Sequence, residues 1–106
     1  MAATNQQMQI MMQMLKNNLE LITDYMDAEA RDQKESELST YINASISFIE
    51  REGIKLNYED IGDETLVVMY ASWLYDKRKD GVSVMPRMLR YNLNNRVFSE
   101  KVGEDV

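Results

Sequence analysis

The residue types that most often carry chemistry are unevenly represented in this chain. It contains no histidine and no cysteine, which removes the commonest general base, the commonest zinc ligand and all thiol chemistry. Closely spaced carboxylates remain, at Asp24/Asp27, Glu50/Glu52 and Asp60/Asp63. These pairs have no histidine or lysine base beside them and fall at expected turns and helix ends, so we interpret them as capping residues. The sequence therefore predicts no enzyme, no cofactor and no metal site.

Basic side chains are the second group with possible chemistry, and they gather toward the C-terminal end. Residues 1–65 carry a net charge of −8, whereas residues 66–106 carry +2. Arg87 and Arg90 stand one helical turn apart and point the same way, which predicts a contact surface for an acidic partner or for phosphate. The Lys77–Lys79 run forms either part of such a surface or a solvated helix end, where cations suit the helix dipole. The overall charge of −6 argues against nonspecific binding of the whole molecule to nucleic acid or anionic membrane.

Hydrophobic spacing predicts an all-α fold, a compact bundle of about four helices in a single domain over residues 1–106. The expected helices span residues 6–22, 38–52, 64–79 and 86–98. Residues 23–37 form either a loop or the exposed start of the second helix, and residues 54–58 form a short extended connector or one short strand. The two ends, 1–7 and 99–106, lack an apolar pattern and are expected to be flexible.

Glycine and proline mark the expected helix ends. Gly53 fits a left-handed cap after the second helix, and Gly81 ends the third. Pro86 fits the first turn of the fourth helix, where its missing N–H is no loss.

The apolar faces of the helices supply the predicted core. Its members are Leu38, Ile42, Ile46, Ile49, Leu66, Tyr70, Trp73, Leu74, Leu89 and Leu93. We expect Trp73, on the most apolar helix, to lie at the centre of this core. Methionines in the first helix mark a core face or, alternatively, an adaptable binding face. Tyr91, next to Arg90, is expected to be partly exposed.

No stretch of the chain approaches the ~20 apolar residues of a membrane span. The first residues also lack the basic start and continuous apolar run of a signal peptide. We therefore expect a protein made and kept in the cytoplasm, unless it is packed into a particle there.

Four strings of residues are more specific than their physical chemistry requires. They are LKNNL at 15–19, IEREGI at 49–54, LVVMYASWLYDKR at 66–78 and MPRMLRYNLNNR at 85–96. In this order and spacing they resemble the head–tail connector family, also called head-completion or adaptor proteins, of long-tailed DNA bacteriophages and prophages. The likeness covers residues 15–101, and the chain differs from the usual pattern in the polar stretch at 24–37.

This resemblance implies a structural virion protein with no catalytic activity. Family members form a ring beneath the portal after DNA packaging, which extends the DNA channel and docks the tail. The implied partners are further copies of the chain, the portal protein, and a tail or further head-completion protein; DNA passes through the channel without sequence-specific binding. The implied location is the head–tail junction of the virion, and the host bacterial cytoplasm before assembly.

A ring requires a heterologous interface, in which one face of each subunit meets a different face of the next. The acidic and basic parts of the chain offer such faces. We hypothesise that neighbouring subunits, or the portal, meet at these residues: Glu29, Asp32, Glu35 and Glu37 on the acidic side, and Arg87, Arg90, Tyr91 and Arg96 on the basic side. Charge complementarity would mainly set register and partner choice.

Other interpretations of the same sequence remain open. The basic last helix could dock on an acidic portal or meet DNA phosphates. The chain could also be a small nucleic-acid-binding or packaging protein, for which steep salt dependence of DNA binding is expected. A helical regulatory or antitoxin-like interaction module, which should form a small closed dimer, is a further alternative.

Overall fold

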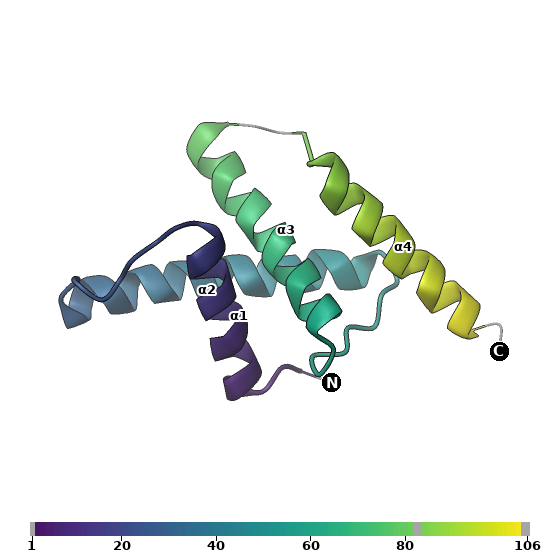
Figure 1. Cartoon of the computed structure of the whole chain (residues 1–106), viewed down its shortest axis with the longest axis horizontal. Helices are drawn as coiled ribbons and strands as arrows, with labels where there is room; N and C mark the ends of the chain where they lie inside the picture. The colour runs from purple at the N-terminus through teal and green to yellow at the C-terminus, as the bar shows by residue number, and fades with distance from the viewer. Residues whose placement is uncertain (1, 82–83, 105–106) are drawn as a thin grey trace.

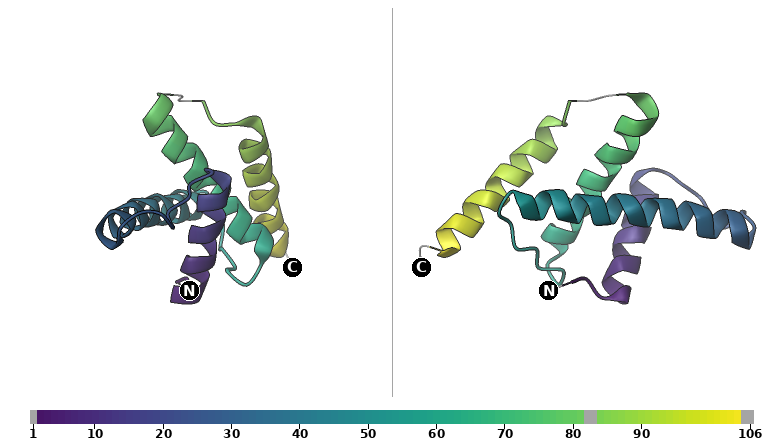
Figure 2. Two further views of the ribbon diagram at one scale, coloured as in Figure 1. Left: turned by 60° about the vertical axis from the view of Figure 1, so that its left-hand side comes forward. Right: turned by 180° about the vertical axis from the view of Figure 1, so that it is seen from behind.

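The chain folds into an all-α bundle of four helices, as its hydrophobic spacing predicts (Figure 1). The computed structural model describes residues 2–81 and 84–104, without the side chains of Lys79, Asp80 and Glu104. Within these residues the helices are α1 (Asn5–Asn18), α2 (Ala28–Arg51), α3 (Ile61–Asp80) and α4 (Arg87–Glu104). Helices α1 and α3 cross the same face of the long helix α2, and α4 lies beyond α3 (Figures 1 and 2). In the described part of the chain no helix is long and apolar enough to cross a membrane.

Side chains that cap the helices set several ends that apolar spacing alone misplaces. The backbone N–H of Gln7 donates to Thr4 Oγ1 at 3.1 Å, and the backbone N–H of Thr4 donates to Gln7 Oε1 at 2.9 Å. This reciprocal capping box starts α1 at Asn5, so residues 5–7, which we expected to precede the ordered part of the chain, are helical. The expected flexible tail is likewise helical to Glu104. Met1 and residues 105–106 lie outside the described residues.

Helix α1 ends before Ile22, where the apolar pattern placed its end. The N–H of Leu21 donates to the carbonyl of Lys16 at 2.9 Å, and the N–H of Glu20 donates to that of Asn17 at 3.1 Å. These bonds form a Schellman motif, with Glu20 in the left-handed region at φ 57°. The motif turns the chain away from the helix axis, so Ile22 is 67% exposed instead of buried.

The core lies between α1, α2 and α3, and α4 adds two leucines to it. Among the predicted core residues, the following are buried: Leu38, Ile42, Ile49, Leu66, Tyr70, Leu89 and Leu93. Ile46, Trp73 and Leu74 are partly buried and pack against them. Trp73 therefore lies at the edge of the core and not at its centre. The start of α4 leaves part of its ring uncovered beside a cavity of about 460 Å³.

The segment between α2 and α3 is extended, and residues 54–57 adopt no regular secondary structure. Its alternating pattern buries Ile54 and Tyr58 and leaves Lys55 exposed. The N–H of Asn57 donates to Asp63 Oδ2 at 2.8 Å, which ties the segment to the first turn of α3. The segment is thus a connector held by side chains, and not a strand.

The bundle is flat and exposes much of its surface. Its extents are 51 × 31 × 18 Å, and its accessible surface is 7152 Å². A typical monomeric protein of 12.4 kDa exposes about 6,100 Å². The excess of roughly 1,000 Å² means that this fold leaves more surface uncovered than a monomer of its mass normally does.

Candidate functional site: two assembly surfaces

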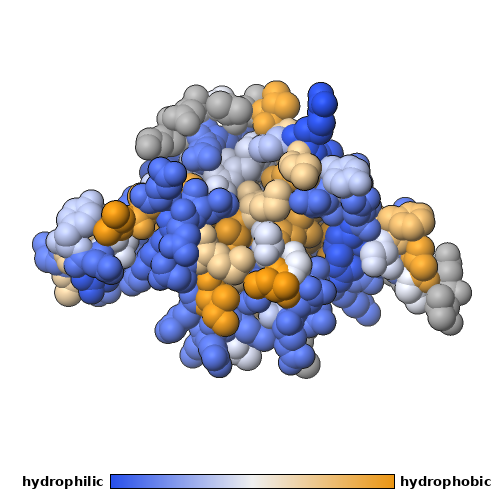
Figure 3. Space-filling view, in the orientation of Figure 1, coloured by the Kyte–Doolittle hydropathy of each residue, from blue (hydrophilic) through white to orange (hydrophobic). Residues whose placement is uncertain are grey.

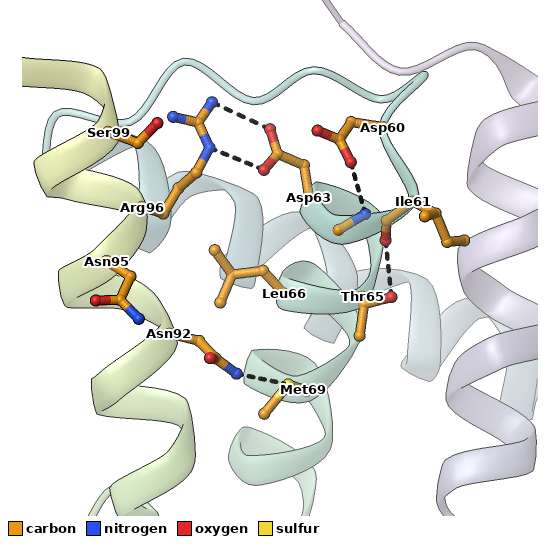
Figure 4. A pocket seen from close by; sticks show the side chains of 11 residues that line it. Asp60, Ile61, Asp63, Thr65, Leu66, Met69, Asn92, Asn95, Arg96 and Ser99 are labelled. Atoms are coloured by element: carbon orange, nitrogen blue, oxygen red, sulfur yellow. Dashed lines mark hydrogen bonds and ion pairs between the residues drawn. The ribbon is translucent and has the colours of Figure 1, made fainter. Parts of the chain in front are cut away.

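Two of the arginines that we predicted at an interface are used inside the chain. Arg90 Nη2 lies 2.6 Å from Glu52 Oε1, which ties α4 to the end of α2. Arg96 Nε donates to Asp63 Oδ1 at 2.8 Å and Nη2 to Asp63 Oδ2 at 3.1 Å, which ties α4 to α3 (Figure 4). The hydrogen bonds to Asp63 raise the pKa of Arg96 above its ordinary value, although burial acts to lower it. Both arginines therefore fix the position of α4 on its own subunit.

Two of the acidic residues that we predicted at an interface, Glu35 and Glu37, are also paired within the chain. Lys16 Nζ donates to Glu35 Oε2 at 2.6 Å and joins α1 to α2. Arg78 Nη1 donates to Glu37 Oε1 at 3.0 Å and joins α3 to α2. Of the Lys77–Lys79 run, Arg78 is thus paired internally, Lys77 lies over the Trp73 ring, and the Lys79 side chain is outside the described residues. Glu35 and Glu37 therefore already have partners.

Helix α4 carries a second, exposed and mostly apolar row outside its buried stripe; two members at the edge of this row, Met88 and Asn95, also line cavities against α3. We call this row the α4 outer face: Met88, Tyr91, Asn95, Phe98 and Val102. Each member is exposed, Phe98 by 69%. The residues follow alternating spacings of three and four, which are the a and d positions of a heptad repeat. Our sequence analysis followed only the buried stripe through Leu89 and missed this row, although the spacing was visible.

The α4 outer face is flanked by cations. Arg87 and Lys101 are exposed, and neither makes an ion pair with any side chain that the structure describes. Glu100, on the inner side of the helix, lies 3.2 Å from Arg96 and is already paired. The outer side of α4 therefore combines apolar side chains with uncompensated positive charge.

The loop between α1 and α2 presents the opposite combination. We call this loop with the first turns of α2 the acidic end: its apolar side chains are Ile22 and Tyr25, and its exposed acids are Glu20, Asp24, Asp27, Glu29 and Asp32. Tyr25 is 79% exposed. Glu29 and Asp32, predicted at an interface, make no ion pair within the described residues.

One arginine holds the acidic end in shape. The guanidinium of Arg31 donates to the backbone carbonyls of Thr23, Asp24 and Met26 at 3.1–3.2 Å. Asp27 then starts α2, because its Oδ1 accepts the N–H of Ala30 at 2.8 Å. The Arg31 guanidinium therefore binds backbone carbonyls, and it forms no ion pair with the described carboxylates around it.

The two surfaces lie at opposite ends of the molecule's long dimension. Figure 1 shows the loop between α1 and α2 reaching the end of the molecule away from α4. Figure 3 shows apolar surface at both extremes, together with an apolar patch over the middle of this face. Helix α4 begins near the middle of the long dimension, and its C-terminal part reaches the end opposite this loop (Figure 1). Arg87 and Tyr91, in the first turns of α4, make no ion pair or hydrogen bond with Glu29 or Asp32 in the described residues of one subunit.

A cavity of about 500 Å³ between α3 and α4 is the third feature of this face (Figure 4). Arg96 closes one end of it on Asp63, and Asn92 Nδ2 donates to Met69 Sδ at 3.6 Å farther along. The charged groups of the cavity are therefore already engaged: Arg96 and Asp63 with each other, and Asp60 with the backbone N–H of Gly62. Across the residues that the structure describes, no group of three acidic side chains is placed to hold a metal ion. We interpret the cavity as a groove between two loosely apposed helices.

Comparisons with known proteins identified no relative of this chain. No family model matches the chain, and no curated protein or solved structure matches it. The features that bear on function are therefore the four sequence strings and the two exposed surfaces, the α4 outer face and the acidic end.

Proposed function

We propose that this chain is a structural assembly protein of the phage head–tail connector kind, whose copies join into a ring. The observation that carries the proposal is the pair of exposed apolar surfaces of opposite charge at opposite ends of the subunit. Head-to-tail assembly needs two different complementary surfaces on each copy, and a subunit of this shape offers both. The four strings that resemble the connector family favour the same function.

The size of the exposed surface supports the proposal. A standard protein–protein interface buries about 800 Å² on each partner. The excess over a typical monomer of this mass is roughly 1,000 Å², which is similar to one such patch. The subunit thus carries enough surplus surface for a specific contact with a neighbour.

In the proposed role, the ring lies below the portal, completes the head, extends the DNA channel and docks the tail. Its partners are further copies of the chain, the portal above and a tail or head-completion protein below. The net charge of −6 fits a protein that lets DNA pass without binding it.

The direct test is addition of the purified chain to the portal ring of the phage or prophage that carries it. Negative-stain electron microscopy should show added ring density on the portal axis, and sedimentation should show the chain moving with the portal. A chain that never binds the portal, and that binds duplex DNA with steep salt dependence, would overturn this function in favour of a packaging protein.

One observation favours a second candidate function, a regulatory module that acts as a closed dimer. Asn95 occupies a central a position of the α4 outer face, and a single Asn at such a position specifies register in parallel two-stranded coiled coils. Pairing of two α4 helices would produce a dimer that does not grow. A mass of two chains at every concentration would support this candidate against the ring.

A further inference from the structure

We infer that the α4 outer face of one copy binds the acidic end of a second copy. This contact rests on the proposed function only in that it takes a second copy as the partner. It assigns specific side chains to the contact: Tyr91 and Phe98 with the flanking Arg87 and Lys101 on one copy, and Ile22 and Tyr25 with the surrounding carboxylates on the other.

Large exposed apolar side chains gather at the α4 outer face and at the acidic end. Singly scattered exposed apolar residues are normal on a soluble protein, whereas a grouped set marks a contact site. Tyr25 and Phe98 are among the most exposed side chains of their kind in the described residues, at 79% and 69%. Aromatic side chains are enriched among the residues that dominate interface energies. The two ends therefore each present aromatic surface that a partner can cover.

Charge decides which surface covers which. Pairing of two α4 outer faces would gather the Arg87 and Lys101 cations of both copies, and among the side chains of α4 that the structure describes the one carboxylate, Glu100, is engaged by Arg96. In an antiparallel pair Arg87 would face Lys101 of the partner, and like charges in such positions are unfavourable; a parallel pair would bring no opposite charge to either cation from the α4 outer face. The acidic end instead brings free carboxylates, including Asp24 and Glu29, against these cations.

Both surfaces are held in fixed shapes before they meet. The three carbonyl hydrogen bonds of Arg31 fix the loop that presents Ile22 and Tyr25. Arg90 and Arg96 fix the rotation of α4 and so determine which of its faces points outward. Little ordering is then needed on association, which favours affinity.

The test uses two variants of the full chain that each damage one surface. The first, Tyr91→Glu with Phe98→Glu, places acids on the α4 outer face. The second, Ile22→Ser with Tyr25→Lys, removes the apolar groups of the acidic end and adds a cation. Ile61→Glu is the matched control, because Ile61 is 64% exposed in the first turn of α3, outside both surfaces.

Analytical ultracentrifugation of each variant alone and of a one-to-one mixture gives the readout. Each variant alone should self-associate about 100-fold more weakly than the wild-type chain, and the control should assemble like the wild type. The mixture retains one intact contact, so it should form a species of two chains and nothing larger. Circular dichroism of each variant checks that the helices are retained.

Each other outcome overturns the inference. If the acidic-end variant alone still assembles like the wild type, α4 pairs with something other than this end. If the α4 variant alone still assembles, the α4 outer face is not used. A wild-type chain that stays monomeric at millimolar concentration would exclude the contact as well. Failure of the connector function shows separately, as head-to-tail assembly of a chain that does not bind the portal.

Discussion

The core formed by α1, α2 and α3 and the attachment of α4 rest on different kinds of contact. The core is made of apolar side chains with no exposed surface: Met11, Leu15, Leu38, Ile42 and Val67. Helix α4 adds Leu89 and Leu93 to it, with Val97 packed at the edge, and is further positioned by polar contacts, chief among them the ion pairs of Arg90 and Arg96.

This difference explains how one side of α4 can be fixed to its own subunit while the opposite side stays exposed. Apolar packing is non-directional, so burial of Leu89 and Leu93 alone sets the rotation of α4 only coarsely. Two arginines on one side of α4 orient it by directed contacts instead. The opposite side, with Tyr91 and Phe98, remains apolar and open to a partner.

The largest effect on stability is expected from a cavity in the core. Ile42→Ala should lower the free energy of unfolding by about 3 kcal/mol, because the fully buried side chain leaves a space that its neighbours only partly fill. Phe98→Ala, which shortens an exposed side chain on α4, should change the free energy of unfolding by less than about 0.5 kcal/mol. Urea unfolding followed by the fluorescence of Trp73 measures both. Equal losses of unfolding free energy in the two variants would contradict the distinction between a buried core and an exposed α4 outer face.

The two arginine contacts of α4 should differ in strength. Asp63→Ala should cost about 2 kcal/mol, since it leaves the guanidinium of Arg96, only 22% exposed, without its main partner. Glu52→Ala should cost less than about 1 kcal/mol, because the Arg90 side chain is 43% exposed and water replaces the lost contact. Urea midpoints of the two variants give the comparison, and a larger loss for Glu52→Ala would contradict this order.

Alkaline pH should weaken the junction between the core and α4. Burial raises the pKa of Tyr70 above its ordinary value of 10.0; nearby Glu52 raises it further and Arg90 lowers it. Burial also raises the pKa of Tyr58. A pKa raised by folding contributes stability that is present below pH 10.0 and is lost as pH rises through the folded value.

Urea midpoints at successive pH values measure this loss. Titration of Tyr58 and Tyr70 should leave the urea midpoint unchanged below pH 10.0 and should lower it above pH 10.0. Tyr70→Phe should make the fall shallower because the phenol no longer titrates. An unchanged slope in that variant would show that Tyr70 does not contribute.

A modest gain in stability is expected at the acidic end. Glu20 adopts φ 57°, a left-handed conformation that costs a residue with a Cβ about 1 kcal/mol. Glu20→Gly should therefore raise the free energy of unfolding by about 1 kcal/mol. Glu20→Ala is the matched control, since it removes the same carboxylate but keeps the Cβ. An equal gain in both variants would attribute the effect to charge and not to backbone conformation.

Local sequence patterns predicted the helices well where the deciding contacts are local. The spacing of Leu38 and Ile42 indicated a buried helix face, and both are buried. Gly53 was expected as a left-handed cap and Gly81 as the end of the third helix, and they adopt φ of 95° and 72°. The Thr4 capping box was also visible as a local pattern, and we missed it by following apolar residues only.

The remaining features depend on contacts that are distant in sequence. Nothing near Arg90 or Arg96 indicates that Glu52 and Asp63 would engage them, because these partners come from other helices. The end of α1 could not be predicted for a related reason. Glutamate rarely adopts the left-handed region, so the residue type at position 20 gives no sign of the Schellman motif there.

Light scattering behind a sizing column, from dilute to concentrated protein and from low to high salt, tests the central claim most directly. Head-to-tail contact of opposite charges predicts a large discrete species at low salt that dissociates as salt screens the cations of α4 from the carboxylates of the acidic end. A species of two chains at every concentration and salt would contradict this account.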